Sequence, residues 1–159
     1  MKALIMDVDG TLTDGGLYIG RRGELMKRFH VKDGYAITKL LPDMGIIPII
    51  ITGRESDIVI HRCRELGITR VIQGSIDKVK DMLEVLQAEG ISLKETAYIG
   101  DDINDLDCMK RVAVRGCPSD AVKEIKEIAD YVTVCNGGNG AVREFVDWLK
   151  ENRINGNRN

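Results

Sequence analysis

The stretch IMDVDGTLTDGG, residues 5–16, places two carboxylates, Asp7 and Asp9, at the end of an apolar run. The run KALIMDV, residues 2–8, has no helical period and predicts a strand that is buried on both faces. Ligands of open α/β sheets bind beyond the carboxyl ends of the strands. Because residues two apart on an extended chain project to the same side, both carboxylates would face one ligand site. The stretch therefore predicts a core strand and the position of a site.

Strands and helices alternate along the rest of the chain. Further short apolar runs predict strands at 46–51, 69–72, 96–100, 111–114 and 131–134. Apolar residues at spacings of three and four predict helices around Ile76, Val79, Leu83 and Leu86; Val122, Ile125 and Ile128; and Val142, Phe145, Val146 and Leu149. This alternation predicts an α/β fold, a Rossmann-like three-layer sandwich with a central parallel sheet.

One segment interrupts the alternation. GGLYIGRRGELMKRFHV, residues 15–31, lies between the first strand and a helical pattern that begins near Asp33. Its two apolar stretches flank GRRG, which predicts a small β-hairpin insertion that is too short to form a lid domain. We therefore expect one domain over residues 1–152, with the hairpin at about 15–31, and a disordered tail at 153–159.

Composition excludes several classes of protein. The net charge of the 159 residues is −2, and the scattered basic residues predict neither nucleic-acid binding nor membrane attachment. No apolar run approaches the roughly 20 residues of a membrane span, and the first residues do not resemble a signal peptide, so we expect a cytoplasmic protein. The four cysteines have no CxxC spacing and are expected to be reduced and mostly buried.

Polar groups also follow the other predicted strands. Thr52-Gly53-Arg54 follows the second strand, Lys78 lies near the start of the helix after the third, and residues 100–105, GDDIND, follow the fourth. Crowded carboxylates raise one another's pKa, and a hard cation relieves the repulsion. Mg²⁺ prefers oxygen ligands, which Asp7 and Asp101 would supply. A lone DxD is more often a turn or a helix cap, but motifs behind separate strands favour a site.

DVDGTLTDG, ITGR, Lys78 and GDDINDLD resemble the four motifs of the haloacid dehalogenase superfamily of phosphotransferases. The resemblance implies that Asp7 attacks phosphorus and that Asp9 acts as the general acid and base. It implies that Thr52 and Lys78 hold the phosphoryl oxygens. Mg²⁺, or alternatively Mn²⁺ or Co²⁺, would be bound by the Asp7 carboxylate, the Asp9 main-chain carbonyl and Asp101.

Four flanking stretches, at 14–37, 51–69, 73–78 and 137–145, resemble the capless 3-deoxy-D-manno-octulosonate 8-phosphate phosphatases. This resemblance implies hydrolysis of a small-molecule sugar-acid phosphate on the route to the lipopolysaccharide inner-core sugar. The substrate contacts that it implies are Asp9, His30, Val31, Lys32, Asp33, Gly34, Arg54, Arg62 and Lys78. Two residues depart from the family pattern, since Lys32 and Asn139 stand where arginine is usual.

Several of these residues have a second interpretation. A helix would place Arg54 and Arg62 on one side, about 12 Å apart, which suits a substrate with two anions. Alternatively, Arg62 pairs with Asp57 or Glu65 on a solvated helix face. His30 contacts substrate or is merely packed, and His61 is expected at the surface. Asp102 and Asp105 either support the metal and Lys78 or cap the next helix.

Other functions remain open from the sequence. A phosphatase of nine-carbon ulosonate 9-phosphates is the nearest alternative, although the arginine after Thr52-Gly53 favours the eight-carbon acid. A catalytically silent assembly module is disfavoured because Asp7, Asp9, Lys78 and Asp101 are all present. A phosphomutase usually needs a cap over its intermediate, which the short hairpin does not provide.

The hairpin also predicts assembly. Its apolar residues cannot all be buried on their own domain, and its edges are unpaired. The related phosphatases are tetramers in which a C-terminal segment reaches an adjacent site. We therefore expect a homotetramer in which Gly137 to Phe145 lies near a neighbouring active site and Arg143 meets an anion. The alternative is that the glycines only turn the chain into the last helix.

Overall fold

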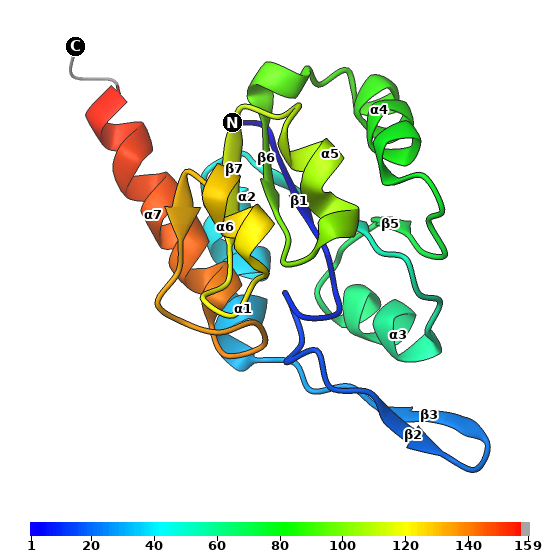
Figure 1. The fold of residues 1–159 in the computed structure, drawn as a ribbon. Coiled ribbons are helices and arrows are strands. Elements are labelled where there is room, and N and C mark those ends of the chain that lie inside the picture. The colour runs from blue at the N-terminus through cyan, green and yellow to red at the C-terminus, as the bar shows by residue number, and fades with distance from the viewer. Residues whose placement is uncertain (157–159) are drawn as a thin grey trace.

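The computed structural model describes residues 1–156, with side chains through residue 152. Residues 157–159 of the expected tail lie outside this range. The last helix, α7 (Ala141–Gly156), continues past residue 152, where we expected the ordered chain to end. The N-terminus and the end of α7 lie at the end of the molecule away from the hairpin (Figure 1).

A six-stranded parallel sheet forms the centre of the molecule, as predicted. Its order is β5-β4-β1-β6-β7-β8, so the first strand of the chain lies near the middle. The strands are β1 (Ala3–Met6), β4 (Ile47–Ile51), β5 (Arg70–Ile72), β6 (Thr96–Ile99), β7 (Val114–Cys117) and β8 (Tyr131–Val132). β1 pairs with β4 on one side and with β6 on the other, which brings three strand ends together.

Helices cover both faces of this sheet (Figure 1). One face carries α1 (Val31–Tyr35), which continues through a π-helix (Ala36–Leu40) into α2 (Leu41–Asp43), together with α3 (Asp57–Glu65) and α7. The other face carries α4 (Lys78–Glu89), α5 (Leu106–Met109) and α6 (Lys123–Ile128). Two short 3₁₀ helices, Leu93–Glu95 and Ile103–Asp105, flank β6.

A hydrophobic core lies on each face of the sheet, and the alternating directions of the β1 side chains explain why there are two. Leu4 and Met6 are fully buried in the cluster with α1, α3 and α7, whereas Ala3 and Ile5 are fully buried in the cluster with α4, α5 and α6. Successive side chains of a strand point to opposite faces, so a strand with helices on both sides must be apolar throughout. This arrangement confirms the predicted three-layer sandwich.

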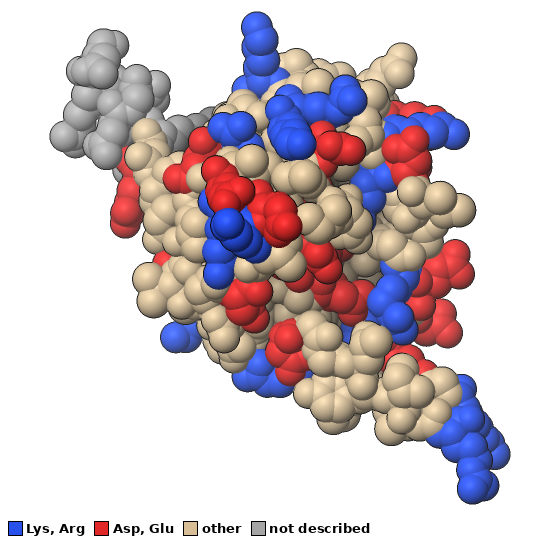
Figure 2. Space-filling model, viewed as in Figure 1, with Lys and Arg blue, Asp and Glu red and all other residues tan. Residues whose placement is uncertain are grey.

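The predicted hairpin consists of β2 (Tyr18–Gly20) and β3 (Gly23–Met26), which pair antiparallel and project from the domain (Figure 1). Uncharged residues cover most of the face of the hairpin that Figure 2 shows, and basic side chains gather at its tip. Four large apolar side chains of the hairpin are more than half exposed: Leu17, Ile19, Leu25 and Met26. One domain therefore leaves this apolar surface uncovered, as expected.

Two predicted elements differ from the structure. The strand expected at 111–114 begins only at Val114, because residues 111–113 turn the chain out of α5, with the Arg111 amide donating to the Cys108 carbonyl. The set of apolar residues expected to form the buried face of α4 is also wrong in part. Asp77 caps the helix, so Ile76 lies outside it and is fully exposed. The buried face carries Lys78, Met82 and Leu86 at spacings of four.

The remaining expectations about composition can also be checked. The four cysteines are free thiols, and Cys63, Cys108 and Cys117 are buried, as predicted. Among the described residues, no helix is both long enough and apolar enough to cross a membrane.

We predict that Met82 and Leu83, neighbours on α4, differ sharply in their contribution to stability. Met82→Ala removes a fully buried side chain and should lower the free energy of unfolding by about 2–5 kcal/mol. Leu83→Ala removes a side chain that is 41% exposed and should cost below about 1 kcal/mol. Urea denaturation of both variants checks this, and equal losses would contradict the observed orientation of α4.

Candidate active site

The ends of β1, β4 and β6 form one cleft, as the sequence predicted. A cleft of about 170 Å³ is lined by Asp7, Asp9, Thr52, Gly53, Arg54, Asp102 and Asn104. Asp7 and Asp9 both face it, which agrees with their expected projection to the same side of the chain. Asp7 and Thr52 are almost fully buried. A ligand in the cleft would therefore reach their polar groups and little of the rest of these side chains.

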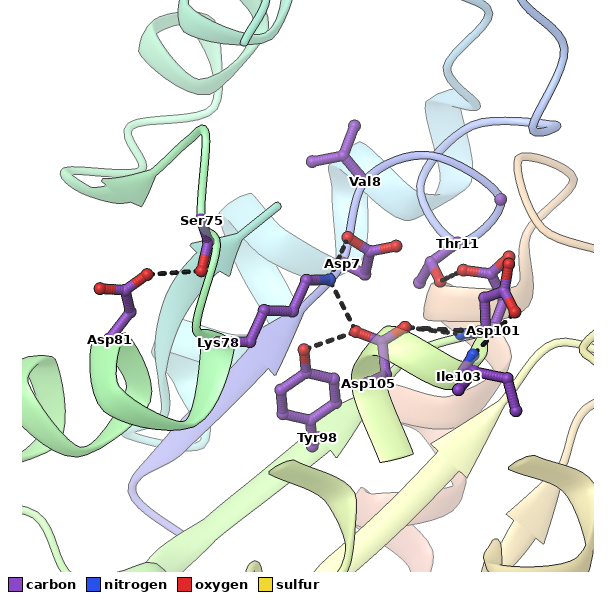
Figure 3. A network of polar contacts seen from close by, with 12 residues as sticks. Asp7, Val8, Thr11, Ser75, Lys78, Asp81, Tyr98, Asp101, Ile103 and Asp105 are labelled. Carbon is purple, nitrogen blue, oxygen red and sulfur yellow. Dashed lines mark hydrogen bonds and ion pairs between the residues drawn. The ribbon is translucent and has the colours of Figure 1, made fainter. Parts of the chain in front are cut away.

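Lys78 lies at the centre of a buried network behind the cleft (Figure 3). Its Nζ donates to Asp7 Oδ1 at 2.9 Å and to Asp105 Oδ1 at 2.8 Å. Burial lowers the pKa of Lys78, but the two carboxylates outweigh burial and raise that pKa above its ordinary value. The ammonium therefore stays charged beside Asp7.

Asp105 is the group that holds this lysine in place. Its Oδ1 also accepts from the Tyr98 hydroxyl at 2.7 Å, and its Oδ2 accepts from the Asp101 amide at 3.1 Å (Figure 3). Asp102, in contrast, caps the following 3₁₀ helix through its contact with the Ile103 amide. The sequence left two roles open for these residues, support of Lys78 and capping of the next helix. In the structure Asp105 supports Lys78, and Asp102 mainly caps the helix.

Asp101 approaches the first loop very closely. Thr11 donates its hydroxyl to Asp101 Oδ1 at 3.1 Å. Gly10 has a φ of 89°, and a Cβ at this position would lie 2.1 Å from Asp101 Oδ2. A side chain at position 10 would therefore displace Asp101, so the glycine is required both by its backbone conformation and by the space that the carboxylate occupies.

Three carboxylates crowd together at this point. Oxygens of Asp7, Asp101 and Asp105 all lie within 4.8 Å of one another. Burial, followed by the charge of Asp105, raises the pKa of Asp7 to about 6. Burial, followed by the charges of Asp7 and Asp105, raises the pKa of Asp101 to about 8. Because Asp105 already accepts from Lys78 and Tyr98, Asp7 and Asp101 are the carboxylates suited to a cation.

Lys27 of the hairpin reaches the site, which the sequence analysis missed. Its Nζ forms ion pairs with Asp9 Oδ1 and, at 2.8 Å, with Glu24, and its side chain is only 1% exposed. Burial lowers the pKa of Lys27, but the hydrogen bonds with Asp9 and Glu24 outweigh burial and raise it. The spacing in the sequence does not indicate that Lys27 lies near Asp9. The one available signal was the charge of this side chain among the apolar residues of the hairpin, since a buried charge needs a partner.

The predicted pairing of Arg54 and Arg62 on one helix is wrong. α3 begins at Asp57, so Arg54 lies in the preceding loop and lines the cleft. Arg62 instead lies over the Phe29 ring, with its Cζ 5.7 Å from the ring centroid, and forms an ion pair with Glu65 at 3.3 Å. The second interpretation of Arg62 is therefore closer to what the structure shows. His61 is exposed, as expected.

The residues expected to contact substrate at 30–34 lie at the start of α1, outside the lining of the cleft. His30 caps α1, because its Nδ1 accepts from the Lys32 amide. Asp33 is buried and accepts from the Arg143 amide at 2.9 Å, and burial raises its pKa. Val31 is exposed, and Gly34 packs where a Cβ would meet Arg62. Their role toward substrate stays a prediction.

The C-terminal segment packs on the first loop of its own chain. The Gly138 amide donates to the Thr11 carbonyl at 3.1 Å, and a Cβ on Gly137 would lie 1.8 Å from the Gly10 carbonyl oxygen. Arg143 forms an ion pair with Asp147 at 2.8 Å. Within one chain, the glycines therefore support the loop that follows β1 as well as leading into α7.

The fold and the site define a class of protein. Residues 64–145 match the family model described as haloacid dehalogenase-like hydrolase. Over 149 residues the chain is 42% identical to the 3-deoxy-D-manno-octulosonate 8-phosphate phosphatase of Escherichia coli K12, covering 94% of this chain and 79% of that protein. The chain thus belongs to the 3-deoxy-D-manno-octulosonate 8-phosphate phosphatase family of the haloacid dehalogenase-like hydrolases.

Solved structures agree with this assignment. The phosphatase of Moraxella catarrhalis, in complex with magnesium, phosphate and the sugar acid, has a TM-score of 0.90 and 38% identity, covering 95% of this chain and 86% of that one. The cobalt-bound phosphatase of Haemophilus influenzae has a TM-score of 0.90 and 36% identity, covering 95% of this chain and 88% of that one.

We predict that the metal-free protein loses stability as the pH rises from about 4 to about 8. The raised pKa values of Asp7 and Asp101, about 6 and 8, mean that the folded chain binds more protons than the unfolded chain in this range. The free energy of unfolding then falls with rising pH. Denaturation in EDTA at several pH values measures this fall, which Asp101→Asn should reduce. An unchanged profile in that variant would contradict the assignment.

Proposed function

We propose that this protein hydrolyses 3-deoxy-D-manno-octulosonate 8-phosphate to the free sugar acid and phosphate, supplying the inner-core sugar of lipopolysaccharide. The observation that carries the proposal is the buried contact between Lys78 and Asp7 beside Asp101, at one cleft with Asp9. This set supports a phosphatase because phosphoryl transfer chiefly needs positioning and stabilisation of charge.

In the first step, a carboxylate oxygen of Asp7 attacks phosphorus. A bond forms between this oxygen and phosphorus while the bond to the C8 oxygen of the sugar breaks and leaves its electron pair on that oxygen. Asp9 donates a proton to the departing oxygen, so the sugar leaves as an alcohol. Lys78 and Thr52, which lie next to Asp7 and in the cleft wall, are suited to hold the phosphoryl oxygens.

In the second step, water releases the phosphate. The Asp9 carboxylate takes a proton from water as the water oxygen attacks phosphorus. The bond between phosphorus and the Asp7 oxygen breaks, and its electron pair returns to the carboxylate. Asp7 and Asp9 thereby regain their starting protonation states, and the cleft can bind the next substrate.

The acidic cluster fits a hard divalent cation. Asp7 and Asp101 provide anionic oxygens whose raised pKa values reflect burial and repulsion that a cation would relieve. Bound there with the Asp9 main-chain carbonyl as a third ligand, Mg²⁺ would neutralise charge on the phosphoryl group. Mn²⁺ and Co²⁺ are alternatives, and the relatives' structures contain magnesium or cobalt.

Recognition of the sugar acid is the less direct part of the proposal. Arg54 lines the cleft and is the cation best placed for the carboxylate of the substrate. The residues from His30 to Gly34, with Arg62, lie outside the cleft of one chain, so they would reach a substrate only across an interface between subunits. Nine-carbon ulosonate 9-phosphates are the competing substrates.

A homotetramer would provide such an interface. The exposed apolar side chains of the hairpin support association, because a surface of this kind is stabilised by burial. Closed symmetry would place each cleft beside a neighbouring subunit, with the segment from Gly137 to Phe145 near that cleft. We also place the enzyme in the cytoplasm, which suits its four free thiols.

We predict that the purified protein has its highest kcat/KM on 3-deoxy-D-manno-octulosonate 8-phosphate, with nine-carbon ulosonate 9-phosphates second. Asp7→Asn should abolish turnover, because an amide is a poor nucleophile, and EDTA should inactivate the wild type. Phosphate release from a panel of sugar-acid phosphates measures both effects. Asp43→Asn, at the exposed end of α2, is the matched control and should keep activity within about threefold.

Full turnover by Asp7→Asn would refute the mechanism. A higher kcat/KM on a nine-carbon substrate would leave the mechanism intact and change the proposed substrate.

We further predict that the hairpin holds the tetramer together. Leu25→Lys with Met26→Lys places charges on its exposed apolar surface and should shift the sedimentation coefficient from that of a tetramer toward that of a monomer. Analytical ultracentrifugation at nanomolar to micromolar concentration measures the shift. A wild-type protein that is monomeric and fully active throughout this range would contradict the assembly.

A further inference from the structure

Lys27 contacts the carboxylate that the mechanism uses as general acid. Its Nζ forms an ion pair with Asp9 Oδ1, and this contact spans 18 positions of sequence, from the hairpin to the end of β1. The contact is made to Asp9 Oδ1, and Asp9 also lines the cleft.

The hairpin also holds Lys27 from a second side. Glu24 accepts from Lys27 Nζ at 2.8 Å, and Glu24 in turn accepts a hydrogen bond from the Ser56 hydroxyl, just before α3. The series Asp9, Lys27, Glu24 and Ser56 thus connects the nucleophile loop to the loop after β4 through the base of the hairpin.

The position of Lys27 distinguishes it from the substrate-binding cations. Its side chain is 1% exposed, and the lining of the cleft includes Asp9 and Arg54 but not Lys27. Lys27 therefore contacts Asp9 without lining the cleft, and a bound substrate need not touch it. Its long side chain would lose rotamer freedom in a buried position, and its two carboxylate partners offset that cost.

We propose that Lys27 is a positioning residue that orients the Asp9 carboxyl toward the leaving oxygen. The proposal rests on the proposed function, in which Asp9 protonates the sugar alkoxide. Without Lys27, the carboxyl would rotate about its side-chain bonds and spend less time in line with that oxygen. General acid catalysis depends on this geometry, and it typically contributes 10²–10⁴-fold to the rate.

The test compares two leaving groups in the full-length protein. A sugar alkoxide needs a proton as it departs, whereas p-nitrophenolate is a weak base and needs little help. Lys27→Met keeps most of the length of the side chain and removes its charge. We expect kcat/KM, which reports transfer to Asp7 and not the later hydrolysis that Asp9 also assists, to fall about 10–100-fold on the sugar-acid phosphate and less than about threefold on p-nitrophenyl phosphate.

Three further variants control this comparison. Lys27→Arg should recover at least about a third of the lost kcat/KM, because it restores a donor to Asp9. Arg22→Met removes a cation from the exposed turn of the same hairpin and should leave both substrates unaffected. In an Asp9→Asn background, Lys27→Met should cost no more than about twofold, because Lys27 acts through Asp9.

Equal losses of kcat/KM on the two substrates in a folded Lys27→Met protein would overturn the proposal, as would no loss on either. If circular dichroism shows that Lys27→Met is unfolded, Glu24→Gln decides by the same ratio, since it removes the second anchor of Lys27. A wild type that hydrolyses a different alkyl phosphate would refute the proposed substrate only. The ratio of that ester to p-nitrophenyl phosphate would then decide the role of Lys27.

Discussion

Three crowded carboxylates, two of them paired with one buried ammonium, are the arrangement on which the rest of this structure depends. Asp7, Asp101 and Asp105 repel one another, and Lys78 alone among the residues of this network offsets their charge. The groups around this network compensate or make room for its charges. Tyr98 and backbone amides satisfy Asp105, and the absence of a side chain at Gly10 admits Asp101. A phosphate ester and a cation would add to this set of opposite charges. Binding and chemistry therefore use charges that folding has already brought together.

The same ammonium determines how α4 lies on the sheet. Lys78 must point into the site from the first turn of the helix, so residues four and eight positions later, Met82 and Leu86, share its direction and fill the core. The orientation of the helix is thus determined jointly by an ion pair at one end and by apolar packing along its length. Local periodicity alone favoured Leu83, because that rule considers apolar residues and cannot know that a charged one is buried.

The parts of the structure that the sequence predicted well are those in which one short motif carries all the information. The strands that precede Asp7, Thr52 and Asp101 end in recognisable groups, and their parallel order brings those groups together. The misses involve partners distant in sequence. Arg62 packs on Phe29 from another element, and Lys27 meets Asp9 only because the hairpin folds back toward the cleft. Neither contact leaves a periodic or local pattern in the chain.

The central place of β1 has a consequence for how the chain is made. Asp101 follows Asp7 by 94 positions, and β6, which precedes it, is one of the two strands that flank β1. A chain that emerges from the ribosome therefore carries Asp7 long before Lys78 and Asp101, the groups that lie beside it in the folded protein. Gly137 and Gly138, which support the first loop, come later still. The groups of the cleft therefore come together only after most of the chain has been made.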